Sequence, residues 1–199
     1  MISTLLGSWV RLRLRRVGSI AARTGLSPNA FTLIGLALNV LVAAVIASGN
    51  LVLAGALALA AGAFDMLDGA VARVTNRITR FGGFLDSTLD RYSEAVLYFG
   101  LLVYLLRSGD NQTGVMLVYA TVVGSIMVSY ARARAEAAGV KAEVGLFARP
   151  ERVVLLALFL ILRRPVWALW VLAILTNLTT AQRILHVWRA TRAADPRAD

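Results

Sequence analysis

Four aspartates occur in one short segment of the chain, and their spacing predicts that they act together. Asp65 and Asp68 are three residues apart, and Asp86 and Asp90 are four residues apart. On helices, each spacing places both side chains of a pair on one face. Carboxylates held close together repel one another, so positive charge must lie among them, supplied either by arginines or by metal ions.

The residues around the acids indicate what this positive charge is for. The chain has no cysteine and one histidine, so a site built on these acids would use oxygen ligands, which suit magnesium or manganese better than zinc. Gly69 and Gly83 leave space for a ligand, and Arg73 offers a planar fork for phosphate. Carboxylates for metal beside an arginine for phosphate indicate phosphoryl transfer. The alternative is a structural ion network with the arginines at positions 73, 77, 80 and 91.

The elements that carry the acids are predicted to be membrane helices, because 58% of the residues are hydrophobic. No charged residue occurs between Arg23 and Asp65, a stretch of 41 residues, and at about 20 residues per crossing this holds two spans. The predicted turn between them is 48–50. A third span starts near residue 84 and carries Asp86 and Asp90 in its first half, which is costly in a membrane unless it serves a function. Further spans are predicted at 111–131 and 165–182.

A fifth span is predicted between Arg152 and Arg163. Only ten residues separate these arginines, fewer than the roughly 18 typical of a span, so a re-entrant segment is the alternative. If all six segments cross, most of the 21 lysines and arginines lie on one side, together with both termini and the acids. The positive-inside rule makes this the cytoplasmic side. The sequence thus predicts an all-α integral membrane protein with six transmembrane helices in the cytoplasmic membrane.

The remaining segments give a simple division of the chain. Residues 1–25 mix arginines with apolar side chains and predict an amphipathic helix on the membrane interface. Residues 26–188 form the membrane domain, and residues 189–199 are polar and predict a disordered cytoplasmic tail. The net charge of +10 does not require nucleic acid as a partner, because membrane topology and a phosphate site account for the basic residues.

The acidic segment resembles the signature of the CDP-alcohol phosphotransferase family. The matching pattern is Asp65-x2-Asp68-Gly69-x2-Ala72-Arg73-x8-Gly82-x3-Asp86-x3-Asp90. The resemblance implies a six-helix membrane enzyme, commonly a homodimer, that moves a phosphatidyl group from a CDP-linked lipid to an alcohol and releases CMP. It also implies a two-metal site held by Asp65, Asp68, Asp86 and Asp90. Asp90 would be the base that takes the proton of the acceptor hydroxyl.

The same resemblance assigns residues to the nucleotide. The positions implied to contact the CDP moiety are Asn29, Thr32, Gly69, Arg73 and Thr79. The first two lie in the segment 26–32, which looks like the nucleotide-contacting segment of the family. Read as bare sequence, Ser27-Pro28 is also an ordinary N-cap and first-turn signal for the first span.

Three later segments supply a second group of arginines: SYARARAE at 129–136, RPER at 149–152 and QR at 182–183. Several arginines near a metal and phosphate site suit an acceptor that is itself phosphorylated; alternatively, they mark the cytoplasmic side and bind lipid headgroups. The segments are similar to those of bacterial phosphatidylinositol-phosphate synthases in the family. The resemblance implies contacts to the acceptor phosphate from Ser129, Arg132, Arg149, Arg152 and Arg183. Arg132 stands where that subgroup usually has lysine, which leaves room for a different acceptor.

The sequence therefore predicts a phosphatidyltransferase that uses two magnesium ions, with manganese as an alternative. Its substrates would be CDP-diacylglycerol and inositol phosphate, and its products phosphatidylinositol phosphate and CMP. One alternative keeps the chemistry and uses glycerol 3-phosphate or another phosphorylated alcohol as acceptor. The other is a divalent-cation transporter, which gives no reason for Arg73 or for the glycine spacing. Glu94, four residues after Asp90, could support the metal ligands; the alternative is a pairing with Arg91 or Arg73.

Overall fold

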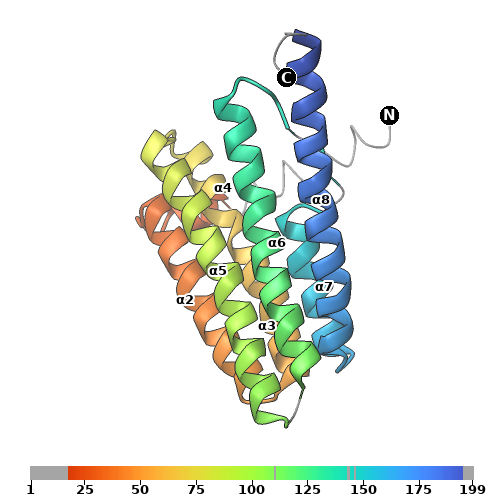
Figure 1. The fold of residues 1–199 in the computed structure, drawn as a ribbon. Helices are drawn as coiled ribbons and strands as arrows, with labels where there is room; N and C mark the ends of the chain where they lie inside the picture. The colour runs from red at the N-terminus through yellow and green to blue at the C-terminus, as the bar shows by residue number, and fades with distance from the viewer. Residues whose placement is uncertain (1–17, 110, 143, 146, 195–199) are drawn as a thin grey trace, which may run out of the picture.

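The computed structural model describes residues 18–109, 111–142, 144–145 and 147–194, and this part of the chain is a bundle of helices (Figure 1). Residues 1–17, which hold most of the predicted interfacial helix, lie outside the described residues, although 18–22 are helical. In chain order the helices are α2 (Pro28–Ala47), α3 (Leu51–Phe64), α4 (Met66–Val74), α5 (Arg80–Arg107), α6 (Gln112–Ala137), α7 (Arg149–Ile161) and α8 (Pro165–Ala194).

Polar side chains fix the starts of the helices that carry the site. The hydroxyl of Ser27 accepts a hydrogen bond from the backbone N–H of Ala30 at the start of α2, with Pro28 in the first turn. The Thr79 hydroxyl accepts from the N–H of Gly82 at 2.9 Å and starts α5. Such caps satisfy backbone donors that have no partner within the helix. The predicted N-cap at Ser27 is confirmed, and Thr79 sets the register of the helix that carries Asp86 and Asp90.

Two local features shape the first half of the bundle. The turn between α2 and α3 occupies residues 48–50, as predicted, and Gly49 there has φ of +88°, which a residue without Cβ adopts at little cost. Asp65 stands at the break between α3 and α4, at the end of an otherwise apolar helix. A Cβ at Gly35 of α2 would collide with the Asp65 carboxylate. The glycine therefore lets this acid lie against α2.

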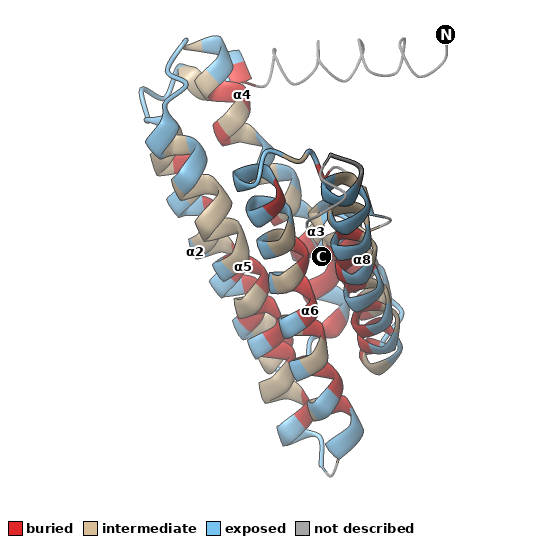
Figure 2. Ribbon diagram, turned by 45° about the horizontal axis from the view of Figure 1, so that its top comes forward, coloured by how far each residue is buried: buried red, intermediate tan, exposed pale blue. Residues whose placement is uncertain are grey.

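Three helix pairs make the main packing of the bundle: α5 on α2, α7 on α3, and α8 on α6. Each pair meets at a glycine. A Cβ at Gly100 would strike the backbone of Ala43, one at Gly55 the backbone of α7, and one at Gly124 the side chain of Thr176. Small residues let helices approach closely in membrane proteins. Figure 2 shows the buried residues on the faces turned toward neighbouring helices and exposed residues on the outer faces.

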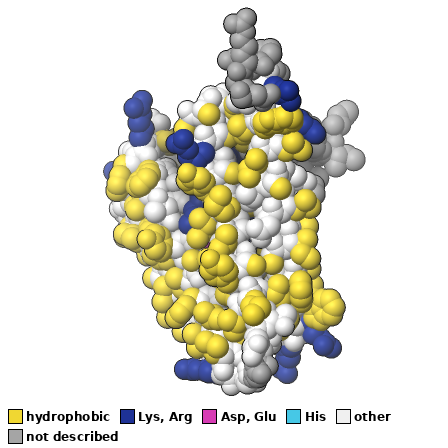
Figure 3. Space-filling view, viewed as in Figure 1, with side chains coloured by type: hydrophobic (Ala, Val, Ile, Leu, Met, Phe, Trp, Pro, Cys, Tyr) yellow, Lys and Arg dark blue, Asp and Glu magenta, His cyan; other side chains and the backbone are white. Residues whose placement is uncertain are grey.

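The outer surface is apolar along the length of the bundle. Figure 3 shows hydrophobic side chains over the middle of one face, with most lysines and arginines toward its two ends. Exposed large side chains in these helices include Leu41, Phe99, Tyr119 and Ile174. A soluble protein rarely exposes so much contiguous apolar surface. The arrangement is that of a membrane protein.

The number of spans is confirmed only in part. Among the described residues, four stretches are long and apolar enough to cross a membrane: Pro28–Ala47, Leu51–Val74, Gln112–Ala137 and Pro165–Arg192. The other two predicted spans correspond to α5, which carries charges in its first half, and α7, which has 13 residues, fewer than the roughly 20 that a crossing needs. Six spans therefore stay a prediction.

The end of the chain differs from its prediction. The polar composition predicts a disordered tail from residue 189, but α8 continues to Ala194. Residues 189–194 are therefore helical, and 195–199 lie outside the described part. Alanine and arginine are good helix formers, and the extension continues a helix that is already nucleated, so polarity alone is a poor indicator of disorder here.

Candidate active site

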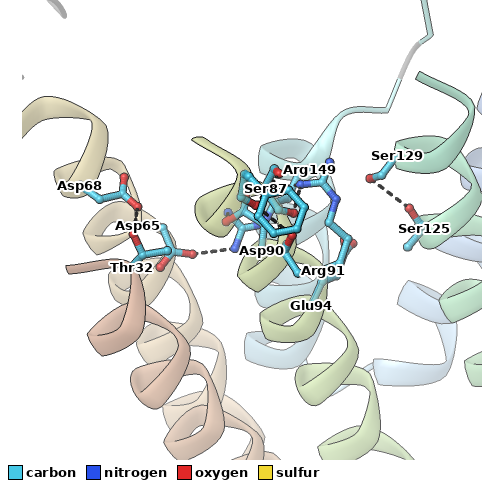
Figure 4. Close-up of polar contacts among 12 residues, drawn as sticks. Thr32, Asp65, Asp68, Ser87, Asp90, Arg91, Glu94, Ser125, Ser129 and Arg149 are labelled. Atoms are coloured by element: carbon cyan, nitrogen blue, oxygen red, sulfur yellow. Dashed lines mark hydrogen bonds and ion pairs between the residues drawn. The ribbon is translucent and has the colours of Figure 1, made fainter. Parts of the chain in front are cut away.

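The four aspartates come from three elements that meet at one end of the bundle. Asp65 lies at the junction of α3 and α4, Asp68 one turn later in α4, and Asp86 and Asp90 one turn apart on α5. Figure 4 shows Asp65 and Asp68 on one side, facing Asp90 across the site. The predicted convergence of the acids is thus present, although the sequence separates the two pairs by an irregular connection at residues 75–79.

Thr32 connects α2 to this group. Its hydroxyl donates a hydrogen bond to Oδ2 of Asp68 at 2.9 Å, and Asp68 is buried. A carboxylate that accepts such a bond is held in one orientation. Thr32 is predicted to contact the nucleotide, and the structure places it next to a predicted metal ligand as well.

Arg149 supplies the positive charge nearest to the acids. Its Nη2 lies 2.7 Å from Oδ2 of Asp65, and its Nη1 lies 2.7 Å from Oδ1 of Asp90. Arg91 is also near, at 3.9 Å from Asp90. Sequence reasoning assigned Arg149 to the acceptor phosphate and considered Arg73 and its neighbours for the acids. Nothing local in the sequence indicates this partner, because α7 begins 59 residues after Asp90 in the chain.

The acids suit a divalent cation by their chemistry. Within the described ranges, no three acidic or histidine side chains are grouped closely enough to hold one ion in this arrangement. The donor set is nevertheless entirely carboxylate, which magnesium and manganese prefer. Asp86 lies close enough to Asp68 and Asp90 to be repelled by both and is attracted more weakly by Arg149, whose direct ion pairs are with Asp65 and Asp90. Negative charge around Asp68 and Asp86 is therefore left for a bound cation to neutralise.

A cavity of about 180 Å³ adjoins the acids and contains every residue that was predicted to contact the CDP moiety. Asn29 and Thr32 come from α2, Gly69 and Arg73 from α4, and Thr79 from the start of α5. Gly82 stands at its floor, where a Cβ would press on the Thr79 hydroxyl and the Asn29 amide. The arginine and the small residues make this cavity suitable for a phosphate-linked group.

A second cavity of about 440 Å³ also adjoins these acids. Asp65, Asp90 and Arg149 line one part of it, and apolar residues such as Leu59 and Val153 line the rest. Asp68 and Asp86 belong to both cavities. The site is therefore two cavities that meet at two carboxylates. Arg73 and Arg77 line the first cavity, and the second has an apolar wall from α3 and α7.

The predicted acceptor residues lie on α6, α7 and α8, and the structure separates them by their partners. Arg132 is exposed and pairs with Glu136 at 2.8 Å. Arg152 is 2% exposed and binds both carboxylate oxygens of Glu94, at 2.5 and 2.8 Å. Neither Arg91 nor Arg73, considered from the sequence as the partner of Glu94, forms this pair. The hydroxyl of Ser129 donates to the carbonyl of Ser125 at 3.4 Å.

Arg183 differs from Arg132, Arg149 and Arg152 because its hydrogen-bond partners are uncharged. It is 6% exposed, and its guanidinium donates to the carbonyls of Val144 and Val128 at 2.9 and 2.5 Å. Among the described residues, no carboxylate lies within salt-bridge distance of it. Arg132 and Arg152 are close enough to repel it, and Glu136 attracts it more weakly. A buried cation among like charges is costly unless an anion joins it.

Comparisons with known proteins agree with this geometry. The profile of the CDP-alcohol phosphatidyltransferase family matches residues 25–186. Archaetidylinositol phosphate synthase of Pyrococcus horikoshii is 38% identical over 177 residues, which cover 88% of this chain and 90% of that protein. Phosphatidylinositol phosphate synthase of Mycobacteroides abscessus is 34% identical, with 89% and 84% of the two chains covered.

A solved structure also has the same fold. The crystal structure of Mycobacterium tuberculosis phosphatidylinositol phosphate synthase with CDP-DAG bound has a TM-score of 0.82 at 30% identity, covering 88% of this chain and 93% of that one. Another crystal structure of that protein is a complex with manganese and citrate. From the matched profile, the relatives and the shared fold, we conclude that the chain is an enzyme of the CDP-alcohol phosphatidyltransferase family.

Proposed function

We propose that this protein transfers a phosphatidyl group from CDP-diacylglycerol to inositol phosphate, giving phosphatidylinositol phosphate and CMP. The observation that carries the proposal is the pair of cavities that share Asp68 and Asp86. A CDP-linked lipid has a polar nucleotide and apolar chains on the two sides of its diphosphate. The site offers one cavity that contains Arg73 and Arg77 and another that has apolar side chains such as Leu59 and Val153, and the two cavities share these acids.

The donor is bound in two parts. Asn29, Thr32, Gly69, Arg73 and Thr79 contact the CDP moiety in the smaller cavity, where Arg73 pairs with phosphate. The diacylglycerol part extends along the apolar wall that includes Leu59 and Val153. Related crystals of the Mycobacterium tuberculosis protein contain CDP-DAG, which supports a donor of this class.

Asp65, Asp68, Asp86 and Asp90 would hold two divalent ions, magnesium or manganese. Such ions neutralise a diphosphate and stabilise the departing phosphate oxygen. Asp90 takes the proton from the acceptor hydroxyl as that oxygen forms its bond to the phosphorus carrying diacylglycerol. The bond from this phosphorus to the CMP oxygen breaks, and CMP leaves. Manganese in a crystal of the related synthase supports a divalent-metal site.

The acceptor is recognised by its phosphate. Arg183 is buried without a carboxylate partner in the described part of the chain, and Arg132 and Arg152 lie close to it. Ser129 and Arg149 complete the proposed set. The relatives named above differ in the lipid that their names give, archaetidyl or phosphatidyl, but both names contain inositol phosphate. This agreement favours inositol phosphate over glycerol 3-phosphate.

The membrane arrangement belongs to the same proposal. Six spans place both termini, the acids and the acceptor arginines on the cytoplasmic side of the cell membrane. Residues 26–188 are the catalytic domain, and the assembly is a homodimer.

Because the chain has no cysteine, a cysteine introduced at one position can show on which side of the membrane that position lies. Ser108→Cys should react with an impermeant maleimide in intact cells, and Ala138→Cys only after permeabilisation; the reverse pattern would contradict this orientation.

The experiment that tests the function is acceptor discrimination. Purified protein with CDP-diacylglycerol and magnesium should release CMP with inositol phosphate, and release far less with free inositol or glycerol 3-phosphate. A CDP-linked ether lipid should be tested in parallel as donor. CMP release with glycerol 3-phosphate and none with inositol phosphate would overturn the acceptor, and an absence of release with any phosphorylated alcohol would overturn the reaction.

A further inference from the structure

A buried polar network lies one helical turn from the acids, and two of its members, Glu94 and Tyr98, have no role in the reaction described so far. Its centre is the pair between Glu94 and Arg152, which are 5% and 2% exposed. Nε and Nη2 of the arginine bind the two carboxylate oxygens, a two-pronged geometry that fixes the plane of the guanidinium. Burying such a pair costs solvation energy and is weak evidence for a stabilising role.

The network continues beyond the pair on both sides. The hydroxyl of Tyr98 donates to Oε1 of Glu94 at 3.0 Å and lies 3.5 Å from the Ser125 hydroxyl on α6. Nη1 of Arg152 donates to the carbonyl of Phe147 at 3.1 Å. Glu94 is therefore held by α5 and α6 while it holds α7 and the segment that precedes it. Its orientation is fixed before any ligand binds.

This pair is the second of two that join α5 to α7. Asp90 and Glu94 are one turn apart on α5, and their partners Arg149 and Arg152 are about one turn apart on α7. The first pair lies at the site and is partly exposed, whereas the second is buried. Glu94 thus fixes the first turn of α7 relative to the catalytic face of α5.

The bonds of Arg152 leave part of its guanidinium unused. They take Nε, one N–H of Nη2 and one N–H of Nη1, and a guanidinium carries five N–H groups. Arg183 is within electrostatic range of Arg152. It donates to the carbonyl of Val144, which lies three residues before Phe147 in the chain. Both arginines thus bind backbone carbonyls of the segment that precedes α7, Phe147 for Arg152 and Val144 for Arg183, which places the two cations in one region of the structure.

We propose that Glu94 is a positioning residue for the acceptor: by gripping one edge of Arg152 it sets which N–H groups meet the acceptor phosphate beside Arg183. Tyr98 supports the same orientation. The inference rests on the proposed function, because it assumes a phosphorylated acceptor at these arginines. Without Glu94, Arg152 keeps its charge but loses its fixed orientation, so acceptor binding weakens while donor binding does not change.

The test compares Glu94→Gln with Glu151→Gln in purified full-length protein. The amide introduced by Glu94→Gln keeps the volume of the side chain but offers one acceptor oxygen in place of two and no charge. Glu151 is exposed and adjacent to Arg152 on α7, so its substitution makes the same chemical change nearby. We expect the KM for inositol phosphate to rise about tenfold in Glu94→Gln, with the KM for CDP-diacylglycerol within about twofold of wild type. Glu151→Gln should change neither.

A milder variant keeps the test valid if Glu94→Gln folds poorly. Tyr98→Phe removes one bond to Glu94 and should raise the acceptor KM about twofold to threefold, again without a change in the donor KM. The proposal is overturned if both variants keep the wild-type acceptor KM. It is also overturned if the two KM values rise in the same proportion, as a merely structural role would produce.

A binding measurement separates this proposal from the proposed function. Inorganic phosphate should raise the melting temperature of the wild-type protein by filling the arginine site. The rise, measured for each protein against its own phosphate-free value, should be smaller for Glu94→Gln and unchanged for Glu151→Gln. An equal rise in all three contradicts the role of Glu94 even if inositol phosphate is not the acceptor. Absence of turnover with inositol phosphate in the wild type instead contradicts the proposed function.

Discussion

The nucleotide side and the acceptor side of the site are built in different ways. The nucleotide side uses α2, α4 and the start of α5, and small and polar residues with two exposed arginines, Arg73 and Arg77, line its cavity. The acceptor side uses α6, α7 and α8, and two of its arginines, Arg152 and Arg183, are buried. Short-range sequence spacing can therefore specify one half of a site, while the other half depends on packing between distant helices.

The largest expected effect lies where the two sides meet. Asp90→Asn removes both the proposed base and a proposed metal ligand, so CMP release should fall by at least about 10³-fold. Thr88→Ala is the matched control, because residue 88 lies two positions from both Asp86 and Asp90 and thus on another face of α5. Retention of a tenth of wild-type turnover by Asp90→Asn would remove the base from the mechanism.

The next largest effects should be a higher KM for one substrate when the acceptor side is changed, and for the other substrate when the nucleotide side is changed. Arg183→Ala is expected to raise the acceptor KM by about tenfold or more, since it deletes a buried cation that is hydrogen-bonded only to carbonyls among the residues described. Arg73→Ala, on the exposed part of the nucleotide cavity, should raise the KM of CDP-diacylglycerol instead. Steady-state kinetics with each substrate varied in turn measures both. Parallel changes in the two variants would mean that the two sides are not separate.

A smaller effect is expected on thermal stability, with and without metal, when Arg149 is replaced. Arg149→Gln removes the charge between Asp65 and Asp90, which then repel one another, so the protein in EDTA should lose about 1 kcal/mol and melt about 2–4 °C lower. Manganese should stabilise this variant more than the wild type, because the ion no longer competes with a guanidinium. Thermal unfolding with EDTA and with manganese tests this directly. Equal stabilisation of both proteins would show that Arg149 and the ion do not compete.

The smallest effect is expected at Thr32. Thr32→Val keeps the shape of the side chain but removes the hydroxyl that donates to Asp68 at 2.9 Å. One hydrogen bond to a charged group contributes about 1.5–3 kcal/mol at most, and water can replace it in an open cavity. We therefore expect the donor KM to rise about threefold with an unchanged acceptor KM. A larger change in the acceptor KM than in the donor KM would show that Thr32 serves the acceptor side and not the nucleotide side.

The sequence predicted best what depends on neighbours along the chain. The N-cap at Ser27 and the turn at 48–50 follow from local hydrogen bonding and backbone freedom. The five nucleotide contacts were predicted from a motif, and they line a single cavity.

What the sequence missed depends on contacts between distant helices. The partner of Glu94 is 58 residues away in the chain, and that of Asp65 is 84 residues away. Charge and spacing allowed several arginines for each acid, and only the packing of α7 selects among them. The helical end of α8 was missed for another reason, since polar composition was given more weight than helix propensity.

The two carboxylates common to both cavities determine which part of the substrate is exchanged during turnover. A donor that spans Asp68 and Asp86 keeps its hydrocarbon chains on one side of the reacting phosphorus and its nucleotide on the other. The substituent exchanged during turnover is then always a water-soluble one, CMP leaving and a polyol phosphate arriving. The hydrocarbon chains of the donor can therefore stay in place while the water-soluble group on the phosphorus is replaced.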